Sequence, residues 1–175
     1  MSDLIWMWTG SNQRIPEYHA WTALCIGLGA KTYVELGCGS SHEQASMGMQ
    51  VVTVDILPNG LNGITHIQAD SHDPATLATV LAHLGGHRPD IVFIDADHTH
   101  EAVAKDFDLW HPAALMAVGF HDILMPGVKE FWEETALLYP SIQIIGRDIA
   151  SAEQWQHLGH VQGQVNCGGI GVIFK

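Results

Sequence analysis

Acidic and histidine side chains lie just after two apolar segments of this sequence, at positions where they could bind a cation or move a proton. Asp95, Asp97 and His98 follow one segment, and His121 and Asp122 follow the next. Carboxylate oxygens are the usual ligands of Mg²⁺ and other hard divalent cations. An imidazole titrates near neutral pH and can take a proton from a reacting group. If the two segments are neighbouring strands, these side chains converge at one edge of a sheet.

A glycine-containing turn lies earlier in the chain. Residues 32–41 read TYVELGCGSS, a short apolar run followed by Gly37-x-Gly39 and by Ser40, which can cap a helix. A strand, a glycine turn and a helix N-terminus together provide room and N–H donors for a nucleotide-like ligand. Asp55 ends the next apolar run, 18 residues after Gly37. This is close to the spacing at which an acid meets a ribose hydroxyl in nucleotide-binding βαβ units.

The details of this turn narrow the class of ligand. Residues 37–42 read GCGSSH, so the third glycine of the dinucleotide motif GxGxxG is absent, which argues against NAD. No GxxxxGK[ST] phosphate-binding loop occurs, and the whole chain holds only seven Lys and Arg residues. These observations favour a ligand that has a ribose and an adenine but no phosphate.

The composition indicates one acidic, globular domain. Of 175 residues, 47% are hydrophobic and 15% are charged, and the formal net charge is −12. This charge repels a phosphate backbone, so a nucleic-acid partner is not expected. The three cysteines lie far apart without a CxxC pair, which indicates neither a zinc knuckle nor a disulfide framework. The N-terminus lacks a secretion signal and residues 20–30 are too short to span a bilayer, so we expect a soluble, cytoplasmic protein with no membrane partner.

Strand-like and helix-like patterns alternate along the chain, and no linker or repeat divides it. The alternation predicts an α/β fold with a doubly wound, mostly parallel sheet and helices on both faces. We expect residues 1–175 to form one domain, with an N-terminal arm and helix over 1–31 and a cofactor-binding core over 32–175. Asp73 and Pro74 are typical of a helix N-cap and a first helical residue. The predicted strands cover 33–36, 51–55, 65–69, 90–94, 114–120, 142–145 and 170–174, and the predicted helices cover 16–28, 43–49, 74–84, 101–110 and 128–138.

The order of these motifs resembles that of class I S-adenosylmethionine-dependent methyltransferases. The motifs are VELGCGSS, VVTVD, QAD, DIVFIDADHTHEAV and GFHDI, followed by the closing GGIGVIFK. More narrowly, the segment IDADHTHEAVAKDFDLW followed by HD resembles small metal-dependent O-methyltransferases that act on sugars, macrolides and related hydroxyl compounds. The resemblance runs from residue 32 to the C-terminus. It implies a Rossmann-like, seven-stranded sheet whose last strand is antiparallel.

The resemblance also implies a binding site for S-adenosyl-L-methionine. Glu35 and the two turn glycines would lie beneath the methionine part of the cofactor. Asp55 would accept hydrogen bonds from the ribose hydroxyls, and Asp70 with Ser71 would lie near the adenine. A carboxylate that accepts two hydroxyl donors makes charge-assisted hydrogen bonds, which are stronger than neutral ones. The implied cofactor-binding residues are Glu35, Gly37, Gly39, Ser40, Asp55, Ile56, Asp70, Ser71 and Asp95.

A divalent metal ion and a catalytic base follow from the same resemblance. An acid at the end of strand four and an acidic or amide pair at the end of strand five hold Mg²⁺ or a similar ion in such enzymes, and Asp95, His121 and Asp122 occupy these positions. His121 stands where an acid is usual, which shifts the expected preference toward Mn²⁺ or another ion that accepts nitrogen. His98 matches the position of a proposed base. In the opposing interpretation, Asp97 and Asp122 only cap helices and His98 is a surface residue.

The sequence therefore predicts a methyltransferase that uses S-adenosylmethionine to methylate a hydroxyl group of a small molecule, with help from a divalent metal ion. One alternative is an NAD-type Rossmann oxidoreductase. Another is a cofactor-binding module that has lost catalysis and acts through partners. About thirty residues precede the first strand, which leaves either an open site for a large acceptor or a pocket completed by a second subunit of a homo-oligomer.

Overall fold

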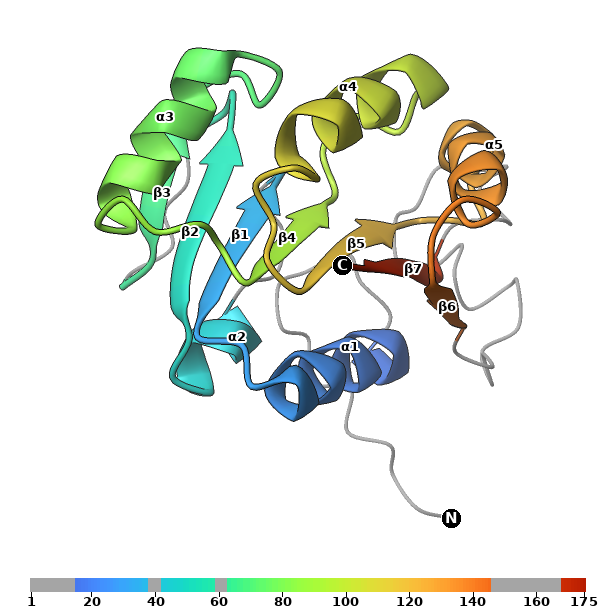
Figure 1. The fold of residues 1–175 in the computed structure, drawn as a ribbon, viewed down its shortest axis with the longest axis horizontal. Helices are drawn as coiled ribbons and strands as arrows, with labels where there is room; N and C mark the ends of the chain where they lie inside the picture. Colours follow the sequence, from blue (N-terminus) through green and yellow to red (C-terminus); the bar gives the residue numbers. More distant parts are fainter. Residues whose placement is uncertain (1–14, 38–41, 59–62, 146–167) are drawn as a thin grey trace, which may run out of the picture.

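The computed structural model describes residues 15–37, 42–58, 63–145 and 168–175, and these residues contain one seven-stranded sheet in the order β3-β2-β1-β4-β5-β7-β6 (Figure 1). Strand β7 runs antiparallel to its neighbours β5 and β6, whereas the other neighbouring pairs are parallel. The predicted mostly parallel sheet with an antiparallel last strand is confirmed. The strands are β1 Thr32–Leu36, β2 Gln50–Asp55, β3 Thr65–Gln68, β4 Ile91–Ile94, β5 Ala117–His121, β6 Ser141–Ile144 and β7 Ile170–Phe174.

Helices cover both faces of the sheet (Figure 1). Helices α1 and α2 lie on one face, and α3, α4 and α5 lie on the other. None of the helices in the described parts of the chain has the length and apolar character needed to cross a bilayer. The helices are α1 Ile15–Leu28, α2 His42–Ser46, α3 Pro74–His83, α4 His100–Trp110 and α5 Pro126–Thr135.

Helix α1 packs on the centre of the sheet through the apolar side chains on one side of the helix. Trp21 and Cys25 are fully buried. The Trp21 indole stacks on Phe93 of β4 with ring centroids 5.3 Å apart, and its Nε1 donates to the Tyr33 hydroxyl at 3.0 Å. A Cβ atom at Gly119 of β5 would lie 2.8 Å from the Trp21 ring, so this strand must carry a glycine where the indole crosses it. The N-terminal helix is thereby attached to the two strands that end in the acidic cluster.

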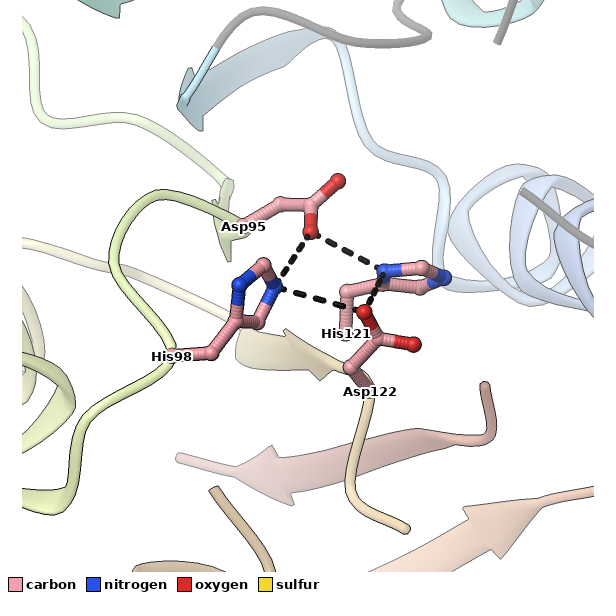
Figure 2. A group of neighbouring side chains, drawn as sticks. All are labelled: Asp95, His98, His121 and Asp122. Atoms are coloured by element: carbon pink, nitrogen blue, oxygen red, sulfur yellow. Dashed lines mark hydrogen bonds and ion pairs between the residues drawn. The ribbon is translucent and has the colours of Figure 1, made fainter. Parts of the chain in front are cut away.

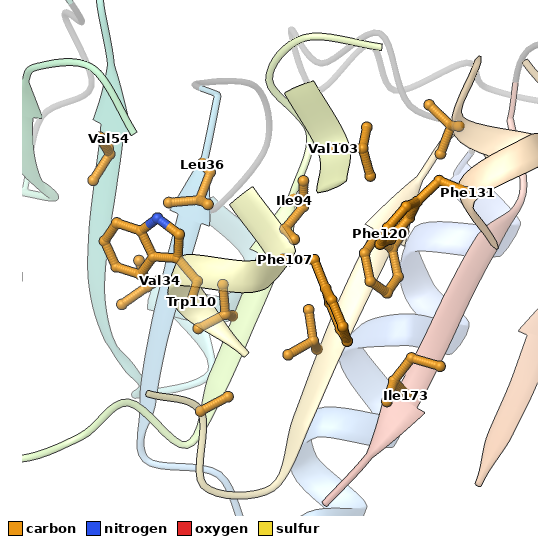
Figure 3. Packing of buried hydrophobic residues seen from close by; sticks show 14 of the residues in the cluster. Val34, Leu36, Val54, Ile94, Val103, Phe107, Trp110, Phe120, Phe131 and Ile173 are labelled. Carbon is orange, nitrogen blue, oxygen red and sulfur yellow. The ribbon is translucent and has the colours of Figure 1, made fainter. Parts of the chain in front are cut away.

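The opposite face is filled by aliphatic and aromatic side chains (Figure 3). Phe107 of α4 contacts Phe120 of β5 and Phe131 of α5, with ring centroids 5.6 and 5.5 Å apart. Trp110 is fully buried, and its Nε1 donates to the Ser71 carbonyl at 2.8 Å. Helix α4 therefore packs on the sheet and also holds the segment that follows β3.

Three predicted elements had boundaries that were wrong by two or three residues. The fifth strand begins at Ala117 and not at 114, because the Ala113 and Ala114 N–H groups bond to the Trp110 carbonyl and continue the end of α4. Helix α5 begins at Pro126 and ends at Thr135 instead of covering 128–138, with proline in its first turn. Helix α2 ends at Ser46 instead of 49, and Gly48 then adopts a left-handed φ of 85°.

The start of α3 confirms the predicted cap. Asp73 is the N-cap, and its side chain accepts a hydrogen bond from the Ala75 N–H at 2.8 Å. Pro74 occupies the first helical position, where its missing N–H costs no hydrogen bond.

Candidate functional site

Asp95, His98, His121 and Asp122 meet at the carboxyl ends of β4 and β5 (Figure 2). The two strands are parallel neighbours, with Ile94 opposite Phe120. The next residue of each strand is Asp95 or His121, so the register itself brings these two side chains together. One ligand atom from each of the four residues lies within 4.8 Å of the others. The sequence analysis expected these side chains to converge if the two segments are neighbouring strands. The structure confirms both the strand pairing and the convergence.

The four side chains alternate between carboxylates and imidazoles (Figure 2). The Nδ1 atom of His121 lies 2.9 Å from Asp95 Oδ1 and 3.5 Å from Asp122 Oδ2. The Nε2 atom of His98 lies 3.5 Å from Asp95 Oδ1 and 3.3 Å from Asp122 Oδ2. Each imidazole therefore faces both carboxylates, as a shared cation would.

The charges in this cluster are strongly interdependent. Burial opposes a charged imidazole at His121, but Asp95 and Asp122 outweigh it and raise the pKa of His121 well above its ordinary value. Burial alone would raise the pKa of Asp95, yet His121 and His98 together lower it. Contact with Asp95 raises the pKa of His98 despite the opposing effect of burial. The two carboxylates thus favour the charged forms of both imidazoles.

Asp122 has an unusual backbone conformation. Its φ of 56° is the only positive value at a non-glycine residue in the described parts of the chain. Its Oδ1 accepts a hydrogen bond from the Gly168 N–H, while Oδ2 faces the two histidines. The N-cap of α5 is Met125, so the interpretation of Asp122 as a helix cap was wrong.

Asp97 lies outside the cluster. Its side chain is exposed and accepts a hydrogen bond from the Thr99 N–H at 2.8 Å, while Thr99 itself caps α4. This local bond lowers the pKa of the Asp97 carboxyl. Asp97 therefore shapes the turn before α4.

Gly37, the first residue of the glycine motif, lies directly against the backbone of Asp95. Gly37, with φ of 84°, ends β1, and a Cβ atom there would lie 2.0 Å from the Asp95 carbonyl oxygen. Only glycine fits where the ends of β1 and β4 approach so closely. Glu35, two residues earlier, is fully buried. Gly39 and Ser40 lie outside the described residues.

The remaining predicted cofactor residues follow β2 and β3. Asp55 ends β2, and its Oδ1 accepts from the Leu57 N–H at 2.8 Å. Ile56 is exposed. Asp70 Oδ1 accepts from the His72 N–H at 2.9 Å, and Ser71 is buried beneath the Trp110 indole. All four residues lie at the same carboxyl edge of the sheet as the acidic cluster.

Two buried acids near these sites were not singled out by the sequence analysis. Glu17 is 1% exposed and Asp106 is fully buried. Glu17 lies four residues before Trp21, and Asp106 lies four residues before Trp110, so each acid sits on the apolar side of its helix. A carboxylate at such a position is rarely buried without a specific reason, and this was the signal that could have found them.

Positive side chains concentrate at the opposite edge of the sheet. Of the five Lys and Arg residues that the structure describes, Lys31 and Arg88 precede β1 and β4, and Lys175 follows the antiparallel β7. These positions are all at the amino edge of the parallel strands. The carboxyl edge is consequently acidic, which favours a positively charged ligand.

Comparison with known proteins places the sequence and the fold in one group. Residues 22–123, more than half of the chain, match a family described as a methyltransferase domain. No curated protein matches the sequence.

Several solved structures share the fold at low sequence identity. An O-methyltransferase from Bacillus cereus in complex with S-adenosylhomocysteine is 14% identical, with a TM-score of 0.53 and coverage of 92% of this chain and 80% of that one. A putative caffeoyl-CoA O-methyltransferase from Staphylococcus aureus is 16% identical, with a TM-score of 0.54 and coverage of 93% and 84%. The MycE methyltransferase of mycinamycin biosynthesis, in complex with Mg and S-adenosylhomocysteine, is 16% identical with a TM-score of 0.55, but the chain spans only 48% of its length.

Proposed function

The chain belongs to the methyltransferase-domain family, and from this premise we propose that it transfers the methyl group of S-adenosylmethionine to a hydroxyl oxygen of a small molecule. The observation that carries the proposal is the contact between two sites. Gly37, which follows β1 and begins the glycine motif, lies against Asp95, which is also a member of the four-residue cluster. A cofactor on this turn and an acceptor at the cluster would therefore be adjacent.

The residues at the carboxyl edge suit this cofactor. S-Adenosylmethionine supplies an electrophilic methyl group on a positively charged sulfur, and the acidic edge of the sheet would attract that charge. Gly37 leaves the end of β1 without a side chain, Asp55 offers carboxylate oxygens to a ribose, and the exposed Ile56 offers an apolar surface. Glu35, Asp70, Ser71 and Asp95 complete the described part of the proposed site, to which Gly39 and Ser40 would be added.

We further propose that Asp95, His121 and Asp122 hold a divalent metal ion, with His98 beside it. A metal ion in this position would lower the pKa of the acceptor hydroxyl. Two carboxylates and one imidazole form a mixed oxygen and nitrogen donor set, which suits Mn²⁺ or a similar transition metal better than Mg²⁺. The Mg reported with MycE belongs to that protein, and the comparison supports a metal here without deciding its identity.

His98 is the better candidate for the general base of the two histidines. Its side chain is 32% exposed, whereas that of His121 is 6% exposed, so an acceptor can reach His98 more readily. The His98 Nε2 atom is itself buried and faces the carboxylates of Asp95 and Asp122 at 3.5 and 3.3 Å. Taking a proton requires the neutral imidazole, and a cation bound by Asp95 and Asp122 would weaken the interactions that now favour the charged form.

Calorimetric titration of the full chain tests the cofactor assignment. We expect S-adenosylhomocysteine to bind and NAD to show no binding. Binding of NAD alone would instead establish the oxidoreductase alternative. Titration with Mn²⁺ and with Mg²⁺, in the presence of S-adenosylhomocysteine, tests the metal centre independently.

An assay of methyl transfer to a panel of sugars, phenols and polyketides then tests catalysis. We expect turnover that depends on added Mn²⁺ and is abolished in the His98→Ala variant. If S-adenosylhomocysteine binds but Mn²⁺ does not, and no hydroxyl compound is methylated, the chain is a cofactor-binding module without this activity.

A further inference from the structure

Glu17, in the first turn of α1, is a buried carboxylate that the proposed chemistry does not use. It is 1% exposed, and its Oε2 accepts a hydrogen bond from the Gly169 N–H at 2.8 Å. The two residues are 152 positions apart in the sequence. Helix α1 is thus joined to the segment that leads into β7.

The Gly168–Gly169 turn is held on its other side by the residues that follow β5. The N–H groups of Ile123 and Leu124 donate to the carbonyls of Gly169 and Gly168 at 3.3 and 3.1 Å. Both glycines have a left-handed φ, and a Cβ atom at Gly169 would lie 2.9 Å from the Ile123 side chain. The turn therefore fits closely between Glu17 and the end of β5.

This turn also determines how Asp122 presents its carboxylate. The Gly168 N–H donates to Asp122 Oδ1, which directs Oδ2 toward His98 and His121 (Figure 2). Asp122 has a left-handed backbone that few non-glycine residues adopt, and such a conformation persists only where surrounding contacts hold it. A displaced Gly168 would leave Asp122 free to rotate away from the cluster.

We propose that Glu17 is a positioning residue for the cation centre, acting through the Gly168–Gly169 turn on the Asp122 carboxylate. The inference rests on the proposed metal centre. Its physical basis is a buried hydrogen bond from the Gly169 N–H to a side-chain oxygen at the position of Glu17 Oε2. Without this bond the Gly169 N–H has no acceptor in a buried place, and the turn moves to find one.

Three substitutions of Glu17 separate the effect of side-chain length from the effect of side-chain charge. Glu17→Gln keeps the side-chain length and an oxygen that can accept from Gly169, whereas Glu17→Asp withdraws the acceptor by one methylene and Glu17→Ala removes it. Loss of a supporting hydrogen bond of this kind typically costs about 10- to 100-fold in metal affinity. We expect such a loss for the Asp and Ala variants and an affinity within about threefold of the wild type for the Gln variant.

The experiment measures Mn²⁺ affinity of the full-length variants by electron paramagnetic resonance, together with calorimetric affinity for S-adenosylhomocysteine. Cys25→Ala is the matched control, because it removes a buried side chain from the same helix without touching the turn. We expect cofactor affinity to stay unchanged in all variants and Mn²⁺ affinity to stay unchanged in Cys25→Ala. The full-length Gln and Asp variants keep the comparison available if Glu17→Ala does not fold.

The outcomes distinguish this inference from the function on which it rests. Wild-type protein that binds no Mn²⁺ would overturn both the metal centre and the role of Glu17. Wild-type binding with equal affinity in the Asp and Gln variants would overturn the role of Glu17 alone. An equal loss of Mn²⁺ affinity in Cys25→Ala would show a general effect of α1 packing and also overturn it.

Discussion

The two parts of the carboxyl edge are built differently. At the ends of β4 and β5, Asp95 and Asp122 are largely buried and contact histidines and backbone groups from distant parts of the chain. At the ends of β2 and β3, Asp55 and Asp70 accept hydrogen bonds from N–H groups only two residues further on. The first part is a buried network of charges, and the second is a pair of local turns. Changes in the network should alter stability and metal binding together, whereas changes in the turns should alter cofactor binding alone.

The largest effect is expected for Asp95→Ala, which removes the carboxylate shared by both histidines. The charged His121 would keep only Asp122 as a counter-ion, and breaking a buried ion pair costs about 3–5 kcal/mol of stability. We expect Mn²⁺ binding to be lost and the denaturation midpoint to fall. Asp97→Ala, two residues away and exposed, is the control and should bind Mn²⁺ as the wild type does. Unchanged Mn²⁺ affinity in Asp95→Ala would remove this residue from the metal site.

Gly37→Ala is expected to affect both parts of the edge. The new methyl group would collide with the Asp95 backbone, and the φ of 84° is unfavourable for alanine. We expect a loss of about 3 kcal/mol of unfolding free energy, with weaker binding of both Mn²⁺ and S-adenosylhomocysteine. Gly27→Ala is the matched control in α1, because no atom lies within 4 Å of its Cβ position. That substitution should instead increase stability by about 0.5–1 kcal/mol in chemical denaturation.

Asp55→Ala tests the contribution of the local turns to cofactor binding, separately from the charge network. Hydrogen bonds to a charged group contribute about 1.5–3 kcal/mol, so affinity for S-adenosylhomocysteine should fall by about 10- to 100-fold. Mn²⁺ affinity should not change, because Asp55 lies outside the cluster. Asp108→Ala, an exposed acid on α4, controls for the change in net charge. Calorimetry that finds wild-type cofactor affinity in Asp55→Ala would refute the ribose-binding role of β2.

The smallest effect on ligand binding is expected for substitution of Asp106, which lies beneath the segment after β3. Burial raises the pKa of this carboxyl to about 6, although the Ser71 hydroxyl and His72, at 3.6 Å, act in the opposite direction. Because the folded pKa exceeds the unfolded value of about 3.9, folding stability is highest below pH 4 with respect to this group and decreases as the pH rises to about 6. Asp106→Asn should remove this decrease, which is on the order of 3 kcal/mol. Equal pH dependence of urea denaturation in the two proteins would contradict the shift.

Several features of the fold and site could be predicted because their signals are local. Alternating strand and helix patterns are visible within about ten residues, and they predicted the sheet. Residues that directly follow parallel strands share one edge, which predicted the proximity of Asp95 and Asp122. The Asp73–Pro74 helix start was equally local.

Other features depended on packing between distant segments and could not be read in this way. The neighbouring placement of β4 and β5 was assumed in the sequence analysis, and only the strand order established it. His121 is the last residue of β5 and is buried, whereas His98 lies in the loop between β4 and α4 and is more exposed. Strand β5 begins later than predicted because the Ala113 and Ala114 N–H groups donate to the Trp110 carbonyl at the end of α4. No residue pattern predicts these hydrogen bonds.

The sequence by itself determined which residue types reach the carboxyl edge, because strand periodicity and turn chemistry act over a few residues. The tertiary structure decided how those residues are held. The Gly169 N–H donates to Glu17, and the Gly168 N–H donates to Asp122. These hydrogen bonds join segments that are separated by tens to more than a hundred residues. Such contacts form only when the whole sheet is packed, because their geometry depends on the relative positions of elements that local sequence does not specify.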